Sequence, residues 1–343
     1  MTLIKSISGI RGTIGGKPGD GLSPLDVVKF TASYTRWVKE TNRKEQPTVV
    51  VGRDARISGE MIESLTCSTL CAMGCNVVNT GLATTPTVEL AVVKERADGG
   101  IILTASHNPV QWNALKLLNG KGEFISAKEG AKILEFAESE DFIFVDVYEL
   151  GSVTKKDYLH EHIDHIINLD LVDVTAISEQ NFKVAFDAVN SVGGVAIPTL
   201  LKALGVQTII PINEKPTGYF AHTPEPLPEN LEETCRTVKE NRVDVCFVVD
   251  PDVDRLSIIS EDGSMFNEEY TLVAIADYVL SITPGNTVSN LSSTRALRVI
   301  TEKHGYSYAA AAVGEVNVVA KMRETNAIIG GEGNGGVIYP ASH

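Results

Sequence analysis

A serine and a histidine stand side by side in the polar segment Thr104 to Pro109, directly after the apolar run Ile101 to Leu103. Such a run predicts a buried strand of parallel type, and ligands of open α/β sheets bind where these strands end. A cation, Lys116, follows a few residues later. The hydroxyl of Ser106 beside His107 is therefore the first candidate for covalent chemistry, as the carrier of a transferred group.

Three carboxylates at alternate positions form a second candidate site. Asp250, Asp252 and Asp254 follow the apolar run Val245 to Val249 and precede Arg255. They can converge on one hard cation such as Mg²⁺, which takes oxygen ligands. An EF-hand is excluded because Arg255 holds the place of the required glycine and strands flank the loop. A phosphatase in which Asp250 itself takes the phosphoryl group stays an alternative, as does an acidic turn without a metal.

The third candidate is the glycine-rich segment Gly330 to Gly336, which contains Glu332 and Asn334. Its glycines match the spacing of a dinucleotide fingerprint. However, that motif should open a helix and be followed about 20 positions later by an acidic residue, and the given sequence stops before that position, so the match is weak. The two remaining interpretations are a loop that presents Glu332 and Asn334 to sugar hydroxyls and a flexible turn.

Strands and helices alternate along the chain around these segments, which predicts βαβ units. We expect an α/β fold of successive domains, each with a mixed, mostly parallel sheet between helices. A polar stretch at 150–157 and a turn at 262–263 suggest the boundaries. The expected domains are 1–149 with the serine loop, 150–256 with the three aspartates, and 257–343 with the glycine-rich loop. The expected strands include 49–51, 76–78, 100–103, 182–186, 206–210, 244–249, 287–289, 308–311 and 327–329, and the expected helices include 24–40, 194–204, 268–281, 296–304 and 316–323.

The composition excludes some classes of protein. A formal net charge of −14 over 343 residues argues against a nucleic-acid surface. No apolar run is long enough to span a membrane, and the first residues lack the apolar core of a secretory signal, so we expect a cytoplasmic protein. In so acidic a chain, an anionic substrate requires local cations, and Arg11, Lys116 and Arg255 are the candidates.

Two clusters of metal-ligand residue types have simpler interpretations. Cys67, Cys71 and Cys75 recur along an expected helix and are predicted to be core residues. His160, His162 and His165 fall in a polar helical pattern, where exposed positions are expected.

Together the three loops resemble those of the α-D-phosphohexomutases, which interconvert hexose 6-phosphates and hexose 1-phosphates. Ile10-Arg11-Gly12 and Lys116 extend the similarity. The resemblance implies that Ser106 is carried as phosphoserine and that a hexose bisphosphate is the intermediate. It implies Mg²⁺ as cofactor, and hexose phosphates as partners without nucleic acid or membrane. The implied residues are Ser106, His107, Lys116 and Arg11 for catalysis, Glu332, Asn334, Arg255 and Asn108 for the substrate, and Ser106, Asp250, Asp252 and Asp254 for the metal.

The segment Trp112 to Lys116 and the asparagine at position 334 are similar to the archaeal-type phosphoglucosamine mutases of that family. They favour glucosamine phosphate as the substrate. Phosphoglucomutase or phosphomannomutase activity, the aspartyl phosphatase and a non-catalytic sugar-phosphate binder are the alternatives. A serine hydrolase is not favoured, because Ala105 and His107 replace the glycines of the Gly-x-Ser-x-Gly elbow.

The family carries a fourth domain that grips the phosphate that is not transferred, and no such segment follows His343 in this sequence. We therefore expect the chain to fold at least its first two domains and to bind Mg²⁺, but to turn over hexose phosphates slowly. The sequence predicts no oligomeric state.

Overall fold

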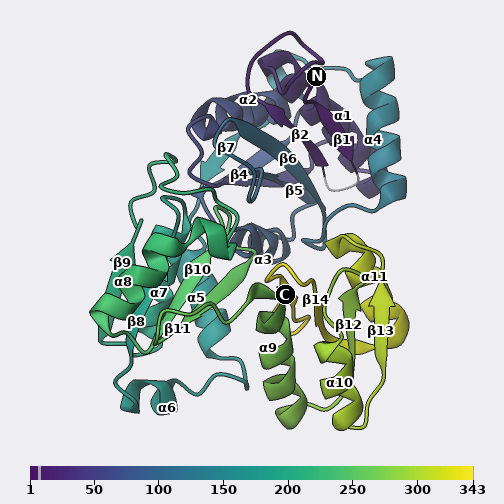
Figure 1. The fold of residues 1–343 in the computed structure, drawn as a ribbon. Helices are drawn as coiled ribbons and strands as arrows, with labels where there is room; N and C mark the ends of the chain where they lie inside the picture. Colours follow the sequence, from purple (N-terminus) through teal and green to yellow (C-terminus); the bar gives the residue numbers. More distant parts are fainter. Residues whose placement is uncertain (7–8, 343) are drawn as a thin grey trace. The chain divides into compact units, whose positions relative to one another are not determined.

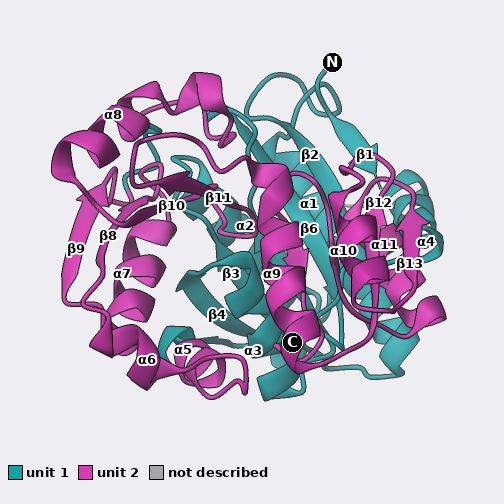
Figure 2. Ribbon diagram, turned by 60° about the horizontal axis from the view of Figure 1, so that its bottom comes forward, with its two compact units in different colours: residues 1–160, 217–220 teal, residues 161–216, 221–343 magenta. Residues whose placement is uncertain are grey.

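The computed structural model describes residues 1–6 and 9–342. Figure 1 shows the order of the elements along the chain. The chain divides into two compact units, coloured in Figure 2. Unit 1 contains residues 1–160 and 217–220, and unit 2 contains residues 161–216 and 221–343.

Unit 1 is built on one seven-stranded sheet with the spatial order β1-β2-β6-β5-β3-β4-β7. In that order the first three neighbouring pairs are antiparallel and the last three are parallel. The predicted mixed sheet is confirmed, with an antiparallel part as large as the parallel part. The strands are β1 (Ile4–Ser6), β2 (Gly9–Thr13), β3 (Thr48–Arg53), β4 (Asn76–Leu82), β5 (Gly99–Leu103), β6 (Trp112–Asn119) and β7 (Val153–Lys155).

Helices cover both faces of this sheet. The helical elements are α1 (Pro24–Asn42), α2 (Gly59–Ala72), α3 (Thr85–Glu95), α4 (Ala127–Ser139) and η1 (Val147–Glu149). Buried residues of α1, α2 and α4 share a cluster with Val49 and Val51 of β3. Val50, which points to the opposite face, packs with α3 instead. Alternate side chains of one apolar strand thus form two cores.

Local sequence signals fix the start of the long helices. Ser23 and Asp26 form a capping box at α1, and Pro24 occupies the first helical position. Ser126 and Glu129 form the same box at α4. These caps satisfy amide groups that a helix N-terminus leaves without partners.

Unit 2 contains two four-stranded sheets, each mostly parallel with one antiparallel strand at an edge. Their spatial orders are β11-β10-β8-β9 and β13-β12-β14-β15. The first sheet consists of β8 (Lys183–Asp187), β9 (Thr208–Ile212), β10 (Val245–Val249) and β11 (Leu256–Ser260). The second consists of β12 (Asn286–Asn290), β13 (Tyr308–Ala311), β14 (Ala327–Gly331) and β15 (Val337–Ile338).

The helices of unit 2 again lie on both faces of each sheet. They are α5 (Leu159–Ile167, which begins in unit 1), α6 (Val174–Glu179), α7 (Gly193–Ala203), η2 (Pro228–Asn230), α8 (Glu232–Asn241), α9 (Glu268–Ile282), α10 (Ala296–Lys303) and α11 (Glu315–Thr325). At the first sheet α8 packs on one face, and α6 and α7 on the other. At the second, α9 and α10 pack on one face and α11 on the other. The predicted α/β fold with mixed sheets is confirmed.

One predicted strand is displaced. We expected a strand at 206–210, but β9 begins at Thr208. Gly205 adopts a left-handed φ of 85°, and the Val206 amide donates to the Leu201 carbonyl at 3.0 Å. Val206 therefore belongs to the turn that ends α7, and the chain enters the sheet only at Thr208.

Cys67 and Cys75 belong to the core cluster under α1 and α2, and Cys71 packs against it. Their predicted core role is confirmed. On α5, His160 is exposed as expected, whereas His162 and His165 are half-buried, so the expected exposure is wrong for these two. Within the described residues, no helix has both the length and the apolar character needed to cross a membrane.

Candidate active site

The serine loop follows β5, and Ser106 lies in a left-handed backbone conformation with φ of 48°. That conformation costs a residue with a side chain roughly 1 kcal/mol. The Ser106 amide donates to Thr104 Oγ1 at 3.0 Å, and Thr104 Oγ1 donates to Asp54 Oδ2 at 2.7 Å. Ser106 Oγ lies 3.4 Å from His107 Nδ1. The structure thus brings the serine and the histidine together, on a backbone held by Thr104 and Asp54.

Sequence reasoning missed two charged residues that hold this loop. Asp54 and Arg56 follow β3, and their fully buried side chains form an ion pair with 3.0 Å between Arg56 Nε and Asp54 Oδ2. Arg56 also donates to the Asn108 carbonyl at 2.7 Å. The available signal was a pair of opposite charges two residues apart, directly after an apolar strand.

Strand register determines where Arg11 and Lys116 lie. Arg11 of β2 is opposite Ala114 of β6, whose carbonyl accepts the Thr104 amide. Lys116 is two residues further along β6 and pairs with Ile102. Since opposite residues and i, i+2 neighbours share a face, Arg11 and Lys116 lie on one face of the sheet. Arg11 is level with the start of the serine loop, whereas Lys116 is set back from it.

The two cations have different surroundings. Lys116 Nζ lies 5.6 Å from the centre of the Phe124 ring. Arg11 Nε is buried and makes no hydrogen bond to the described residues. Asn108, expected at the substrate, donates from Nδ2 to the Ala105 carbonyl at 2.8 Å, so this amide stabilises the turn of the serine loop.

The three aspartates lie together after β10. Oxygens of Asp250, Asp252 and Asp254 lie within 4.8 Å of one another, and Asp250 and Asp252 are buried. At an effective dielectric constant of about 20, two full charges at that separation repel by about 3 kcal/mol. Within the described part of the chain, no other group of three or more His, Cys, Asp or Glu side chains meets this geometry. The arrangement could hold a metal ion.

The backbone of the aspartate loop is strained at Val253, whose φ is 61°. A positive φ is strongly disfavoured for a β-branched residue, and such strain is typical of functional sites. Asp250 Oδ1 accepts hydrogen bonds from the amides of Asp254 at 3.2 Å and Arg255 at 3.3 Å. Asp250 therefore folds the loop as well as contributing to the carboxylate cluster.

The glycine-rich loop after β14 is anchored through Glu332. Its Oε1 accepts from Asn290 Nδ2 at 2.6 Å and from the Gly314 amide at 2.8 Å. Asn334 Nδ2 lies 3.4 Å from Glu332 Oε2. Both side chains are half-buried, and sequence reasoning found neither Asn290 nor Gly314 because both bonds are non-local.

A hydrogen bond joins this loop to the end of the aspartate loop. The Leu256 amide donates to the Gly335 carbonyl at 3.1 Å. Gly335 has φ of 88°, and a Cβ there would lie 2.5 Å from the Leu256 carbonyl oxygen. Only glycine allows this approach, so two of the predicted loops form one surface.

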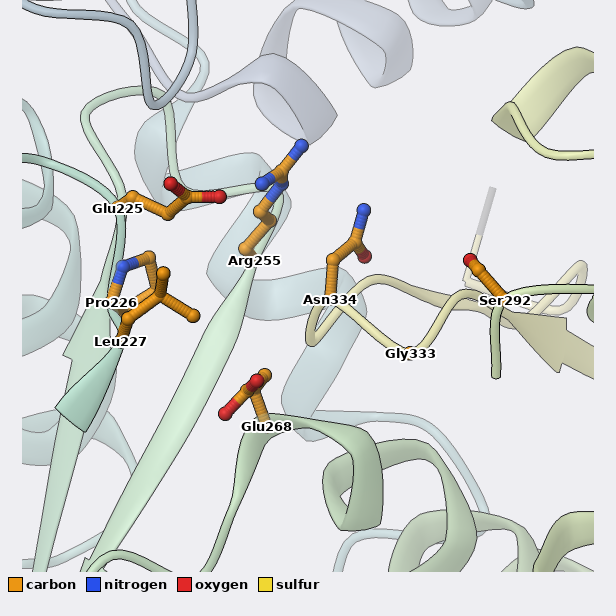
Figure 3. Close-up of a pocket in the computed structure, with 8 residues that line it drawn as sticks. All are labelled: Glu225, Pro226, Leu227, Arg255, Glu268, Ser292, Gly333 and Asn334. Atoms are coloured by element: carbon orange, nitrogen blue, oxygen red, sulfur yellow. The ribbon is translucent and has the colours of Figure 1, made fainter. Parts of the chain in front are cut away.

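That surface contains a pocket of about 160 Å³ in unit 2. Figure 3 shows the side chains that line it, among them Glu225, Arg255, Glu268 and Asn334. The three charged side chains are half-buried. The pocket is lined by Glu225, Pro226, Leu227, Arg255, Glu268, Ser292, Gly333 and Asn334.

A buried carboxylate, that of Asp187, contacts the histidine His222, which lies shortly before the pocket residue Glu225 in the sequence. Asp187 Oδ2 lies 3.2 Å from His222 Nε2 and accepts from Thr234 Oγ1 at 2.6 Å. Burial acts to raise the pKa of Asp187, but the hydrogen bonds from His222, Thr234 and the Val189 amide and the charge of His222 together outweigh it, so the pKa is lowered. Burial acts to lower the pKa of His222, but the hydrogen bond and charge of Asp187, with smaller contributions from the Thr223 carbonyl and Glu233, together outweigh it, so the pKa is raised. The pair fixes the segment that leads to Glu225.

The pH dependence of this pair follows from the two directions. A carboxylate with a lowered pKa stabilises the fold above its unfolded pKa, and this contribution is lost as pH falls through the folded pKa. A histidine with a raised pKa stabilises the fold below its unfolded pKa, and this contribution is lost as pH rises through the folded pKa. Since the unfolded-state pKa is about 3.9 for an aspartate and about 6.5 for a histidine, the pair stabilises the folded state most between roughly pH 4 and 6.5.

The similarity to known proteins extends along the whole chain. Residues 3–144, 160–263 and 267–343 match, in order, alpha/beta/alpha domains I, II and III of phosphoglucomutase/phosphomannomutase. The chain is 36% identical over 333 residues to a phosphoglucomutase/phosphomannomutase of Thermococcus kodakarensis, covering 96% of this chain and 72% of the relative. The chain belongs to the α-D-phosphohexomutase family. The predicted reaction class, an intramolecular phosphotransfer between hexose positions, is confirmed with it.

Further comparisons agree with this family membership. The chain is 30% identical over 339 residues to a "Probable phosphoglucosamine mutase" of Methanopyrus kandleri, covering 98% of this chain and 71% of the relative. A solved structure of a phosphoglucomutase/phosphomannomutase family protein from Burkholderia thailandensis superposes with a TM-score of 0.85 at 27% identity. It covers 100% of this chain and 74% of that protein. The predicted closeness to the archaeal-type phosphohexomutases is consistent with these relatives.

Proposed function

We propose that this phosphohexomutase acts on hexosamine phosphates. It would interconvert glucosamine 6-phosphate and glucosamine 1-phosphate through a phosphoserine at Ser106. The observation that carries the substrate preference is the charge pattern of the pocket in unit 2. Glu225, Glu268 and Arg255 line the same small pocket. None of the three side chains makes an ion pair or hydrogen bond to another described residue.

A pocket that contains positive and negative side chains without ion pairs between them suits a ligand that carries both a positive and a negative group. Arg255 can bind a phosphate oxygen, and the two carboxylates can bind an ammonium group. An aminosugar phosphate carries both groups, whereas glucose and mannose phosphates carry only the anion. The Methanopyrus kandleri relative, at 30% identity, is named for the same substrate class, whereas the Thermococcus kodakarensis relative, at 36% identity, is named for glucose and mannose phosphates.

The chemical step that we propose at Ser106 is a direct transfer. A sugar hydroxyl attacks the phosphorus of phosphoserine, the bond from phosphorus to Ser106 Oγ breaks, and a hexose bisphosphate forms. The proton lost by the hydroxyl balances the proton gained by Ser106 Oγ. His107 Nδ1, 3.4 Å from that oxygen, is the proposed group that holds the proton there. Return of the other phosphoryl group regenerates the phosphoserine.

Mg²⁺ is the proposed cofactor. Asp250, Asp252 and Asp254 offer an all-oxygen set of ligand atoms within 4.8 Å of one another, which suits a hard divalent cation. Ser106 is the proposed further ligand through its phosphate oxygen. When bound, the ion would neutralise charge on the transferring phosphoryl group.

The remaining residues have proposed binding roles. Arg11, whose buried Nε makes no hydrogen bond to the described residues, and Lys116 would supply positive potential for phosphate. Glu332 and Asn334 would accept and donate hydrogen bonds to sugar hydroxyls, and Asn108 would hold the serine loop. The domain division at 1–149, 150–256 and 257–343 remains part of this proposal.

A substrate panel tests the preference. Initial rates are measured with glucosamine 6-phosphate, glucose 6-phosphate and mannose 6-phosphate, each with its bisphosphate as activator and Mg²⁺ present. We expect the highest kcat/KM for glucosamine 6-phosphate and no activity in Ser106→Ala. A higher kcat/KM for glucose or mannose 6-phosphate would contradict the preference, and activity retained in Ser106→Ala would contradict the mechanism.

A further inference from the structure

The Arg56 guanidinium is buried beneath the serine loop and binds it along its length. Arg56 is 1% exposed. Its Nη1 donates to the carbonyls of Pro109 at 2.8 Å and Trp112 at 3.1 Å. Its Nη2 donates to the carbonyls of Asn108 at 2.7 Å and of Ser106. One side chain thus binds four carbonyl groups of the segment from Ser106 to Trp112.

Asp54 links Arg56 to the other side of Ser106. Its Oδ2 accepts from Arg56 Nε at 3.0 Å and from Thr104 Oγ1 at 2.7 Å, and its Oδ1 accepts from the Arg56 amide at 2.9 Å. Thr104 Oγ1 in turn accepts the Ser106 amide at 3.0 Å. Asp54 and Thr104 are both fully buried.

Both backbone polar groups of Ser106 therefore belong to one closed network. The amide is held through Thr104, and the carbonyl is held by Arg56. This network fixes Ser106 in a left-handed conformation, with φ of 48°, that a serine does not favour in isolation. The direction in which Oγ points follows from that backbone.

The segment Thr217–Phe220 belongs to unit 1 and packs against Ala55 and Arg56. The Phe220 ring centre lies 5.1 Å from the Arg56 guanidinium carbon. Gly218 has φ of 73°, and a Cβ there would lie 2.0 Å from the Ala55 carbonyl oxygen. This close packing restricts access of water to the Arg56 guanidinium, which strengthens its hydrogen bonds.

We infer that Arg56 is a positioning residue for phosphoryl transfer, acting through the backbone of Ser106 and not on the reacting atoms. The inference rests on the proposed function of Ser106. Because a small misplacement of a reacting group can cost about 100-fold in rate, loss of the network should slow transfer to and from Ser106 strongly. The sugar pocket of unit 2 contains no residue of this network, so substrate affinity should change little.

The test compares Arg56→Lys with the wild-type chain. The readout is the single-turnover rate at which glucose 1,6-bisphosphate phosphorylates Ser106, measured as a function of bisphosphate concentration. Lysine keeps the charge, but its single nitrogen cannot bind four carbonyls and Asp54 together. We expect a rate at saturation about 100-fold lower, with the half-saturating concentration changed less than about threefold.

Controls separate positioning from a loss of stability. Ile62→Ala shortens a buried side chain of the same unit, in a core cluster that includes no residue of the segment 104–112, and it should lower Tm while keeping the transfer rate. Substitutions of Thr104 interrupt the same network at the Ser106 amide. Thr104→Val removes the hydroxyl and should slow transfer, whereas Thr104→Ser keeps the hydroxyl and should transfer at close to the wild-type rate. This pair keeps the inference testable if Arg56→Lys does not fold.

The outcomes distinguish the inference from the proposed function. The positioning role is wrong if Arg56→Lys and Thr104→Val transfer phosphate at the wild-type rate. It is also wrong if their loss of transfer rate is no larger than that of Ile62→Ala when the variants have the same Tm. If the wild-type chain acquires no phosphate on Ser106, the proposed function itself is wrong.

Discussion

Removing the negative charges of the pocket should change which sugar the enzyme prefers. In Glu225→Gln and Glu268→Gln the shape of each side chain is kept and its charge is lost. Both side chains line the pocket and are half-buried. A glutamine can still bind a hydroxyl, but it attracts an ammonium group far less.

The size of the effect follows from Coulomb's law. An ammonium about 5 Å from a carboxylate gains roughly 1 kcal/mol in bulk water and roughly 3 kcal/mol at an effective dielectric constant of about 20. For a half-buried group we take about 1 to 2 kcal/mol, which corresponds to about a 5- to 30-fold change in relative kcat/KM. The effect should shrink as salt is raised, since the groups are partly exposed.

The assay is the ratio of kcat/KM for glucosamine 6-phosphate to that for glucose 6-phosphate. We expect each variant to lower this ratio by about 5- to 30-fold, with glucose 6-phosphate turnover nearly unchanged. Glu229→Gln is the matched control, because Glu229 is exposed on η2 outside the pocket lining. A ratio within twofold of wild type in both variants, or equal losses with both sugars, would refute the charge argument.

Three further predictions concern other parts of unit 2. His222→Gln should lower the free energy of unfolding by about 2 kcal/mol near pH 5.5, and the difference from wild type should shrink above about pH 7. Urea unfolding at a series of pH values measures this difference, and a difference that does not depend on pH would contradict the pairing with Asp187. Gly335→Ala should destabilise by at least about 1 kcal/mol more than Gly305→Ala, which shares a positive φ but has no atom within 4 Å of its Cβ; equal Tm losses would refute the role of that contact. Mg²⁺ should raise the Tm of wild type and not of Asp252→Asn, by calorimetry with and without EDTA; equal shifts would place the ion elsewhere.

The main features of the fold could be predicted because their signals are local. Apolar runs such as 101–103 and 245–249 are strands in the structure, and each is followed by a polar loop. The serine and aspartate loops were found because chemically active residue types are adjacent in the sequence. Ser106 and His107 are neighbours, so their contact follows directly.

Features that depend on distant segments could not be predicted in the same way. Arg56 binds carbonyls about 50 residues away, and Glu332 is anchored by Asn290 and Gly314. The antiparallel strand β6, which carries Lys116, was not predicted because its pattern lacks clear alternation of apolar and polar residues. Such contacts are set by the topology of the sheets.

The proposed mechanism requires Ser106 to carry the phosphoryl group between sugar positions. The most direct measurement loads the chain with labelled phosphate from glucosamine 1,6-bisphosphate, maps the phosphate by mass spectrometry, and then adds unlabelled glucosamine 6-phosphate. We predict one phosphate on Ser106, its transfer to the sugar on the second addition, and no labelling of Ser106→Ala. A hydroxylamine-labile phosphate on Asp250, or label on Ser106 that the sugar does not remove, would contradict the account.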